Sequence, residues 1–89
     1  MTEAVEIVMY SSGWCPYCER ARALLARKGL AFREIKVDLE PGEREAMLAR
    51  SGGRRTVPQI FIGDHHVGGF DDLYALDKAG KLAELTAGN

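Results

Sequence analysis

Hydrophobic and polar positions follow two different periods in the first third of the chain. A short β-branched run, Val-Glu-Ile-Val-Met-Tyr, occupies positions 5–10 ahead of two serines and a glycine, which predicts a strand buried on both faces. A helix is expected next, because Pro16 suits the first helical position and Gly29 ends the segment behind two basic residues. Its apolar face carries Cys18, Ala21, Leu24 and Leu25 at helical spacing, whereas Glu19, Arg20 and Arg27 lie away from that face.

The middle of the chain predicts a second strand and a second helix. Ile35, Val37 and Leu39 alternate with charged residues, which is typical of a strand with one polar face or a strand at a sheet edge. Pro41 is expected to open a helix that includes residues 43–49 and ends at a pair of glycines.

The last part of the chain predicts a hairpin followed by a third helix. A Gly-Asp turn separates residues 59–62 from residues 65–67, a pattern that indicates a tight β-hairpin. The final helix is expected to run from Phe70 or Asp71 to about Ala79, with a glycine closing it.

The expected element order is therefore β-α-β-α-β-β-α. Two strands joined by a helical crossover should be parallel, and the hairpin adds antiparallel strands. The predicted fold class is α/β, a mixed four-stranded sheet flanked by three helices. The sequence shows no linker, repeat or low-complexity segment, so we expect residues 1–89 to form a single domain.

Composition and charge remove several classes of function. Twelve basic and thirteen acidic residues give a formal net charge of −1, which leaves no electrostatic signature for binding nucleic acid or an anionic membrane. Glu3 and Glu6 stand where a secretory signal would be basic, and the apolar run there is short. We therefore expect a cytoplasmic protein. In that compartment two close cysteines are more often catalytic or metal-binding than structural.

Both cysteines lie in the segment Cys15-Pro16-Tyr17-Cys18, where the first helix should begin. A cysteine in the first turn of a helix faces unpaired backbone N–H groups and the positive end of the helix dipole, which favour the thiolate. Cys18 follows one turn later on the apolar face, close enough for a disulfide but deeper. The spacing predicts that Cys15 attacks a disulfide and that Cys18 resolves the mixed disulfide that forms.

Two other uses of this cysteine pair are weaker. A disulfide staple across so short a loop would remove little entropy from the unfolded chain. A structural zinc site needs four ligands, and the remaining candidates, His65 and His66, are neighbours on an expected strand and so face opposite sides of it. We therefore expect no metal site, and we interpret both histidines as solvated residues of the hairpin.

Three separated motifs resemble those of the glutaredoxins, specifically the small bacterial dithiol class. They are Cys15-Pro16-Tyr17-Cys18 after the first strand, Thr56-Val57-Pro58 before the third strand, and Gly68-Gly69-Phe70-Asp71-Asp72 at the start of the last helix. The similarity covers nearly the whole chain, and the family's thioredoxin-like fold has the element order expected here. The resemblance implies a thiol-disulfide oxidoreductase that uses glutathione as its reductant and needs no bound cofactor.

The resemblance also implies a set of glutathione contacts. In the family, the proline matching Pro58 follows a cis peptide bond, and the residue matching Val57 pairs its backbone with the cysteine of glutathione. The helix start at residues 68–72 offers N–H groups to the γ-glutamyl carboxylate, while Asp72 can pair with the neighbouring ammonium group, cap the helix, or do both. The implied glutathione-binding residues are Tyr17, Thr56, Val57, Pro58, Gly69, Phe70, Asp71 and Asp72, and Arg54 is a further candidate.

One position departs from the family pattern. Many members carry a lysine three residues before the first cysteine, where it reaches the glycine carboxylate of glutathione, and Ser12 stands at that place here. A hydroxyl group cannot supply this charge, so Arg44, Arg54 and Arg55 are candidates to replace it. Trp14 is expected to be either a lip for partner proteins or a partly buried ring.

The expected reactions are removal of glutathione from proteins through Cys15 alone and reduction of protein disulfides through Cys15 and Cys18. Ribonucleotide reductase is a candidate client, nucleic acid and membranes are not expected partners, and the default oligomeric state is a monomer. Two alternatives stay open. One is a redoxin supplied by thioredoxin reductase, which would lack the glutathione site; the other is an iron–sulfur cluster carrier, against which Pro16 and Cys18 both argue.

Overall fold

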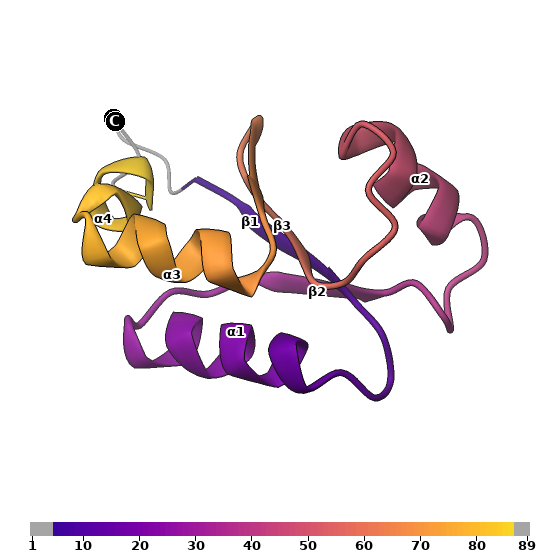
Figure 1. The fold of residues 1–89 in the computed structure, drawn as a ribbon, viewed down its shortest axis with the longest axis horizontal. Coiled ribbons are helices and arrows are strands. Elements are labelled where there is room, and N and C mark those ends of the chain that lie inside the picture. Colours follow the sequence, from indigo (N-terminus) through magenta and orange to yellow (C-terminus); the bar gives the residue numbers. More distant parts are fainter. Residues whose placement is uncertain (1–4, 87–89) are drawn as a thin grey trace.

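The computed structural model describes residues 5–86, which build one mixed sheet with helices on both faces (Figure 1). The strands are β1 (Ile7–Ser11), β2 (Arg33–Lys36), β3 (Gln59–Ile62) and β4 (His65–Gly68), and the helices are α1 (Pro16–Arg27), α2 (Glu43–Arg50), α3 (Phe70–Lys78) and α4 (Lys81–Thr86). The strand order is β2-β1-β3-β4, with β1 parallel to β2 and antiparallel to β3. The predicted α/β class and the mixed four-stranded sheet are confirmed.

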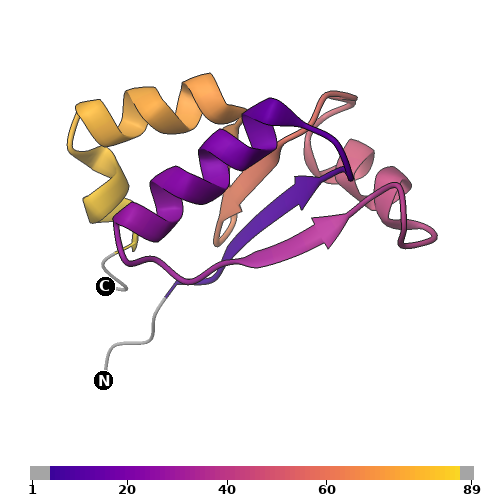
Figure 2. The same cartoon turned by 90° about the horizontal axis from the view of Figure 1, so that it is seen from below.

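The alternation of side chains along β1 divides the core into two layers. Ile7 and Met9 pack with α1, α3 and α4 on one face of the sheet, whereas Val8 and Tyr10 pack with Met47 of α2 on the other. Figure 2 shows α1 and α3 side by side over the first face, with α2 beyond the far end of the sheet. All five residues of β1 are buried, as predicted for a strand covered on both faces.

The second strand and second helix are shorter than predicted. The chain turns after Lys36, because the N–H groups of Leu39 and Glu40 both donate to its carbonyl. Leu39 is consequently 69% exposed, and its assignment to the strand was wrong. The helix begins at Glu43 and not at Pro41, because Gly42 before it adopts a left-handed conformation with φ of +83°.

The third helix, α3, was predicted to be the last one, and it ends at Lys78, close to the predicted end near Ala79. A fourth helix, α4, follows it and was not predicted. Leu82 of α4 is buried against the core layer that contains α1 and α3, which explains why this short segment is ordered. Over the described range, no helix combines the length and apolar character needed to cross a membrane.

Candidate active site

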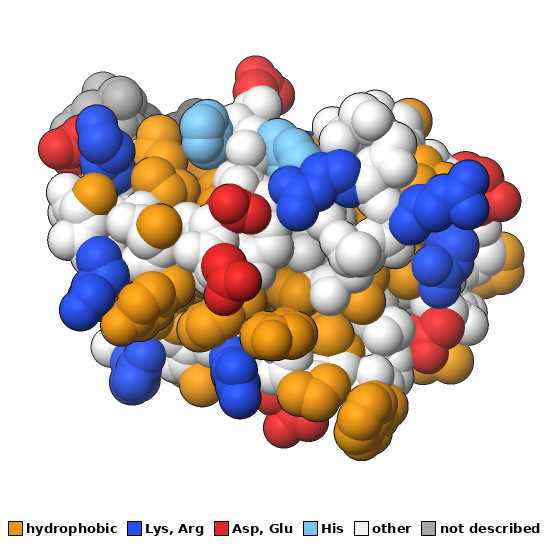
Figure 3. Space-filling model, in the orientation of Figure 1, with side chains coloured by type: hydrophobic (Ala, Val, Ile, Leu, Met, Phe, Trp, Pro, Cys, Tyr) orange, Lys and Arg blue, Asp and Glu red, His pale blue; other side chains and the backbone are white. Residues whose placement is uncertain are grey.

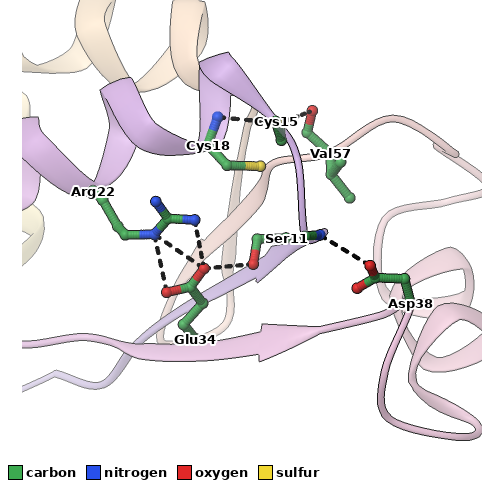
Figure 4. Close-up of polar contacts among 8 residues, drawn as sticks. Ser11, Cys15, Cys18, Arg22, Glu34, Asp38 and Val57 are labelled. Atoms are coloured by element: carbon green, nitrogen blue, oxygen red, sulfur yellow. Dashed lines mark hydrogen bonds and ion pairs between the residues drawn. The ribbon is translucent and has the colours of Figure 1, made fainter.

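The Cys15 sulfur caps the start of α1. Its backbone is extended (φ −155°, ψ 101°), and its Sγ accepts a hydrogen bond from the Cys18 N–H at 3.2 Å. Pro16 takes the first helical position, where its missing N–H would have had no helical partner. The Cys15 thiol also lies 3.6 Å from the Val57 carbonyl, to which it donates (Figure 4). The predicted placement of Cys15 at the helix tip is confirmed.

Cys18 lies deeper than Cys15, as its position on the apolar helix face predicted. Cys18 is fully buried, whereas Cys15 keeps 9% of its surface exposed, and both are free thiols. Burial and the hydrogen bond with Cys15 raise the pKa of the Cys18 thiol to about 12. Cys18 is therefore a protonated thiol at neutral pH, and the two sulfur atoms are chemically unequal.

An ion pair lies beneath Cys18, and sequence reasoning missed it. Arg22 Nε lies 3.0 and 3.1 Å from the two Glu34 carboxylate oxygens, and Arg22 Nη2 lies 2.9 Å from Oε2 (Figure 4). The hydroxyl of Ser11 donates to the same oxygen at 2.6 Å. Arg22 follows Cys18 by four residues, a spacing that places both on one helix face. The sequence carries that signal but does not say which polar residue of β2 meets Arg22.

A buried amide fixes the loop that faces Cys15. The Gln59 side chain donates from Nε2 to the Thr56 carbonyl at 2.9 Å and to its hydroxyl at 3.2 Å. Its other atom, Oε1, pairs with His66 Nε2 at 2.7 Å. The Val57–Pro58 peptide bond is cis, as the resemblance implied. A side chain of β3 thus holds the loop in place from the interior of the protein.

The two histidines differ in their surroundings. His65 is exposed, as predicted, but the solvated interpretation was wrong for His66. The His66 ring stacks on Phe61 with 4.7 Å between ring centroids, and its partial burial and the charge of Arg54 lower its pKa. Among residues 5–86, no three His, Cys, Asp or Glu side chains gather as a metal site would require.

A pocket of about 280 Å³ opens beside Val57, the residue that contacts Cys15. The start of α1, the loop before β3 and the start of α3 all contribute to it. The ring of Tyr17 stacks on that of Phe70, with 6.5 Å between centroids, and the pair forms an aromatic wall. The structure brings together every residue that the resemblance implied and the further candidate Arg54: the pocket is lined by Tyr17, Arg54, Thr56, Val57, Pro58, Gly69, Phe70, Asp71 and Asp72.

Charges of both signs lie at the α3 side of this pocket. Asp72 Oδ2 accepts a hydrogen bond from the Gly69 N–H at 3.0 Å, so the predicted capping role is confirmed. The same oxygen lies 3.8 Å from Arg54 Nη1. Arg44 and Arg55, the other candidates to replace the missing lysine, line a separate hollow of about 200 Å³. Arg54 is therefore the candidate that the fold places in the pocket.

Exposed aromatic side chains lie in the cysteine motif, where Tyr17 is 53% exposed, and directly before it. Trp14 is 83% exposed, so its interpretation as a partly buried ring was wrong, and its role as a lip for partner proteins stays a prediction. Figure 3 shows hydrophobic side chains gathered in a band across the lower front of the molecule, over α1 and α3. Arg20 lies over the Tyr17 ring at 5.2 Å, which adds a basic edge to this band.

Exchange between thiols and disulfides needs one sulfur that attacks and a second that resolves the mixed disulfide. The N-cap and the first turn of α1 provide these two sulfur atoms, and the one at the N-cap is the more exposed. The fold and these two cysteines define a thiol-disulfide oxidoreductase. The chain belongs to the glutaredoxin family, whose model matches residues 7–67.

Relatives with known names extend this similarity over most of the chain. A glutaredoxin of Pseudomonas aeruginosa is 58% identical over 79 residues, which make up 89% of this chain and 93% of that protein. Glutaredoxin 3 of Escherichia coli K12 is 53% identical over 79 residues, 89% of this chain and 94% of the relative. The crystal structure of a buckwheat glutaredoxin–glutathione complex matches with a TM-score of 0.83 at 34% identity, covering 93% of this chain and 77% of that one.

Proposed function

We propose that this protein is a glutathione-dependent oxidoreductase that removes glutathione from protein mixed disulfides and reduces protein disulfides. The observation that carries the proposal is the pocket between the starts of α1 and α3, which lies beside the cysteine pair and carries charges of both signs. The similarity to the buckwheat glutaredoxin, which was solved as a complex with glutathione, supports the same ligand here.

The chemistry of the pocket suits glutathione in three ways. The backbone of Val57, next to the cis bond to Pro58, is the group that we expect to pair in strand-like fashion with the central cysteine of the ligand. The N–H groups at the start of α3 suit the γ-glutamyl carboxylate, and Asp72 suits the ammonium group next to it. Arg54 supplies a positive charge in the same pocket, where the side chain of Ser12 has none to offer.

The proposed reaction begins at Cys15. Its thiolate attacks the glutathione sulfur of a mixed disulfide, the protein thiol leaves, and free glutathione then removes the glutathionyl group from Cys15 as oxidised glutathione. For a protein disulfide, Cys15 first forms a mixed disulfide with the client, and Cys18 then displaces the client. Two glutathione molecules reduce the resulting Cys15–Cys18 disulfide.

The setting of this reaction is proposed on the same grounds. We place it in the cytoplasm, carried out by residues 1–89 as one glutaredoxin domain that acts as a monomer. No resident cofactor takes part, since glutathione itself supplies the electrons. Glutathionylated and disulfide-bonded proteins are the proposed clients, with ribonucleotide reductase among the candidates.

A glutathione-coupled assay with two cysteine variants tests this function. Wild-type protein should turn over a small glutathionylated disulfide and a disulfide-bonded protein. Cys15→Ser should lose both activities, whereas Cys18→Ser should keep the first and lose the second. Mass spectrometry should find glutathione attached to Cys15 in the Cys18→Ser variant. Turnover with thioredoxin reductase but not with glutathione would reject the proposal.

A further inference from the structure

The ion pair between Arg22 and Glu34 is partly buried and lies beneath the buried Cys18 thiol. The side chains of Arg22 and Glu34 are 33% and 20% exposed, and Ser11, which binds the same carboxylate, is fully buried. Figure 4 shows Arg22 and Cys18 projecting from the same side of α1, toward the end of the sheet where Ser11 and Glu34 lie. Three hydrogen bonds from Arg22 and one from Ser11 fix this arrangement.

Glu34 is an anchor in this arrangement and a poor candidate for a base. Burial by itself would raise the pKa of Glu34, but the hydrogen bonds from Arg22 and Ser11 outweigh it and lower that pKa. A carboxylate stabilised in this way accepts a proton weakly. What Glu34 does is hold the guanidinium of Arg22, which is charged at every working pH, in one orientation.

We propose that Arg22, held by Glu34 and Ser11, is a positioning residue for the resolving step, in which its fixed positive charge stabilises the Cys18 thiolate. This inference rests on the dithiol route of the proposed function. Arg22 touches neither the client nor glutathione in this role, and it acts through Cys18 alone.

The resolving step exchanges one disulfide for another. Cys18 loses its proton, and its sulfur forms a bond to Cys15 Sγ as the bond between Cys15 and the client sulfur breaks. The electron pair of the broken bond leaves on the client sulfur, which takes up a proton from solvent in place of the one released by Cys18. No other oxidant or reductant enters this step.

Arg22 matters most once Cys15 has formed a mixed disulfide. In the reduced protein, burial and the interaction with Cys15 together raise the pKa of Cys18. Once Cys15 is in a mixed disulfide, its thiol and its charge are gone. Burial is then the remaining influence that raises the Cys18 pKa. Two influences lower the Cys18 pKa: the backbone hydrogen bond with Ser12 and the charge of Arg22. Neither involves the client or the Cys15 sulfur, so both remain when Cys15 forms the mixed disulfide.

The size of the effect follows from thiol chemistry. The Arg22 charge is the smallest of the influences on the Cys18 pKa in the reduced protein, so we take the lower end of the usual effect of a nearby opposite charge, about one unit. Loss of Arg22 should then lower the thiolate fraction of Cys18 ~10-fold. The more basic thiolate is ~3-fold more nucleophilic at a Brønsted coefficient of ~0.45, which leaves a net slowing of ~3- to 4-fold.

Ellman's reagent separates the two cysteines within a single experiment. Attack by Cys15 releases one coloured thiolate and leaves a mixed disulfide, and attack by Cys18 then releases a second in a first-order step. Arg22→Gln should slow the second release ~3- to 4-fold and leave the first within about twofold. Arg22→Lys keeps a positive charge and should restore most of the second rate.

A matched control removes an ion pair elsewhere on the same helix. Lys28 lies at the C-terminal end of α1 and pairs with Asp77 at 2.9 Å, so Lys28→Gln should change neither release. The pH dependence gives a second readout. The rate of the second release should rise with pH as Cys18 ionises, and in Arg22→Gln this rise should extend to higher pH. The charged groups around this step are Glu19 and Arg22 of α1, and Glu34 and Lys36 of β2, because Cys15 at the N-cap has lost its charge in the mixed disulfide.

Three results would overturn the inference: an unchanged second release in Arg22→Gln, equal slowing of both releases, or a lysine variant as slow as the glutamine variant. The measurement contains no glutathione. A failure of the proposed glutathione dependence would appear in the coupled assay instead, and the two failures are therefore distinguishable.

Discussion

Replacing Asp72 by asparagine should weaken glutathione binding and leave the chemical step intact. Asp72 Oδ2 accepts the Gly69 N–H at 3.0 Å and lies 3.8 Å from Arg54 Nη1. Asparagine keeps an oxygen that can accept the Gly69 hydrogen bond, so the cap at the start of α3 survives. The substitution therefore removes mainly the negative charge proposed to pair with the ammonium group of the ligand.

The expected loss is modest because the site is open to solvent. The side chains of Asp72 and Arg54 are 52% and 47% exposed, so their charges are well screened. A contact of this kind is worth about 0.5 to 1 kcal/mol, which corresponds to a ~2- to 5-fold increase in KM for a glutathionylated substrate. Because this contact is the same in the ground state and the transition state, kcat should stay unchanged.

Steady-state kinetics on a small glutathionylated disulfide, at low and high salt, measure this effect. The increase in KM should shrink at high salt, where the lost contact is screened in both proteins. Asp64→Asn is the control, since it removes one negative charge from the exposed hairpin turn between β3 and β4. The reasoning would be refuted if kcat fell at constant KM, or if Asp64→Asn raised KM as much as Asp72→Asn.

Two further predictions concern stability. Burial and nearby positive charge lower the pKa of His66 from 6.5, so the unfolded chain binds more protons and the melting temperature should fall as pH drops from about 7 to 5. His66→Gln should flatten this dependence in calorimetry, and an unchanged slope would contradict the assignment. A β-carbon at Gly68 (φ +116°) would overlap Asp72 Oδ2, whereas one at Gly53 (φ +95°) would meet nothing. Gly68→Ala should therefore destabilise the protein by about 1 to 3 kcal/mol and by more than Gly53→Ala, and equal losses in denaturant titrations would show that the overlap is relieved.

Cys15 and Cys18 show how far sequence reasoning reaches into the site. They are three positions apart across the start of a helix, and helix geometry alone places the first at the tip and the second on the inward face. Predicting the pocket residues also required the family resemblance, since Tyr17, Arg54 and Asp72 come from separate segments. The network of Gln59, Thr56 and His66 was missed, because it depends on side chains of β3 and β4 meeting behind a loop.

The sequence by itself determined the order of the elements from β1 to α3, the buried strand β1 and the unequal placement of the two cysteines. These features follow from local periodicity and from Pro and Gly positions, which act within a few residues of the chain. Tertiary structure decided where β2 ends, that Leu82 would join the core through α4, and that Arg22 would meet Glu34 and Ser11 beneath Cys18. Such contacts join positions that are far apart in the chain, such as Ser11 and Glu34, which are 23 residues apart. They depend on strand register and helix packing, which local periodicity does not encode.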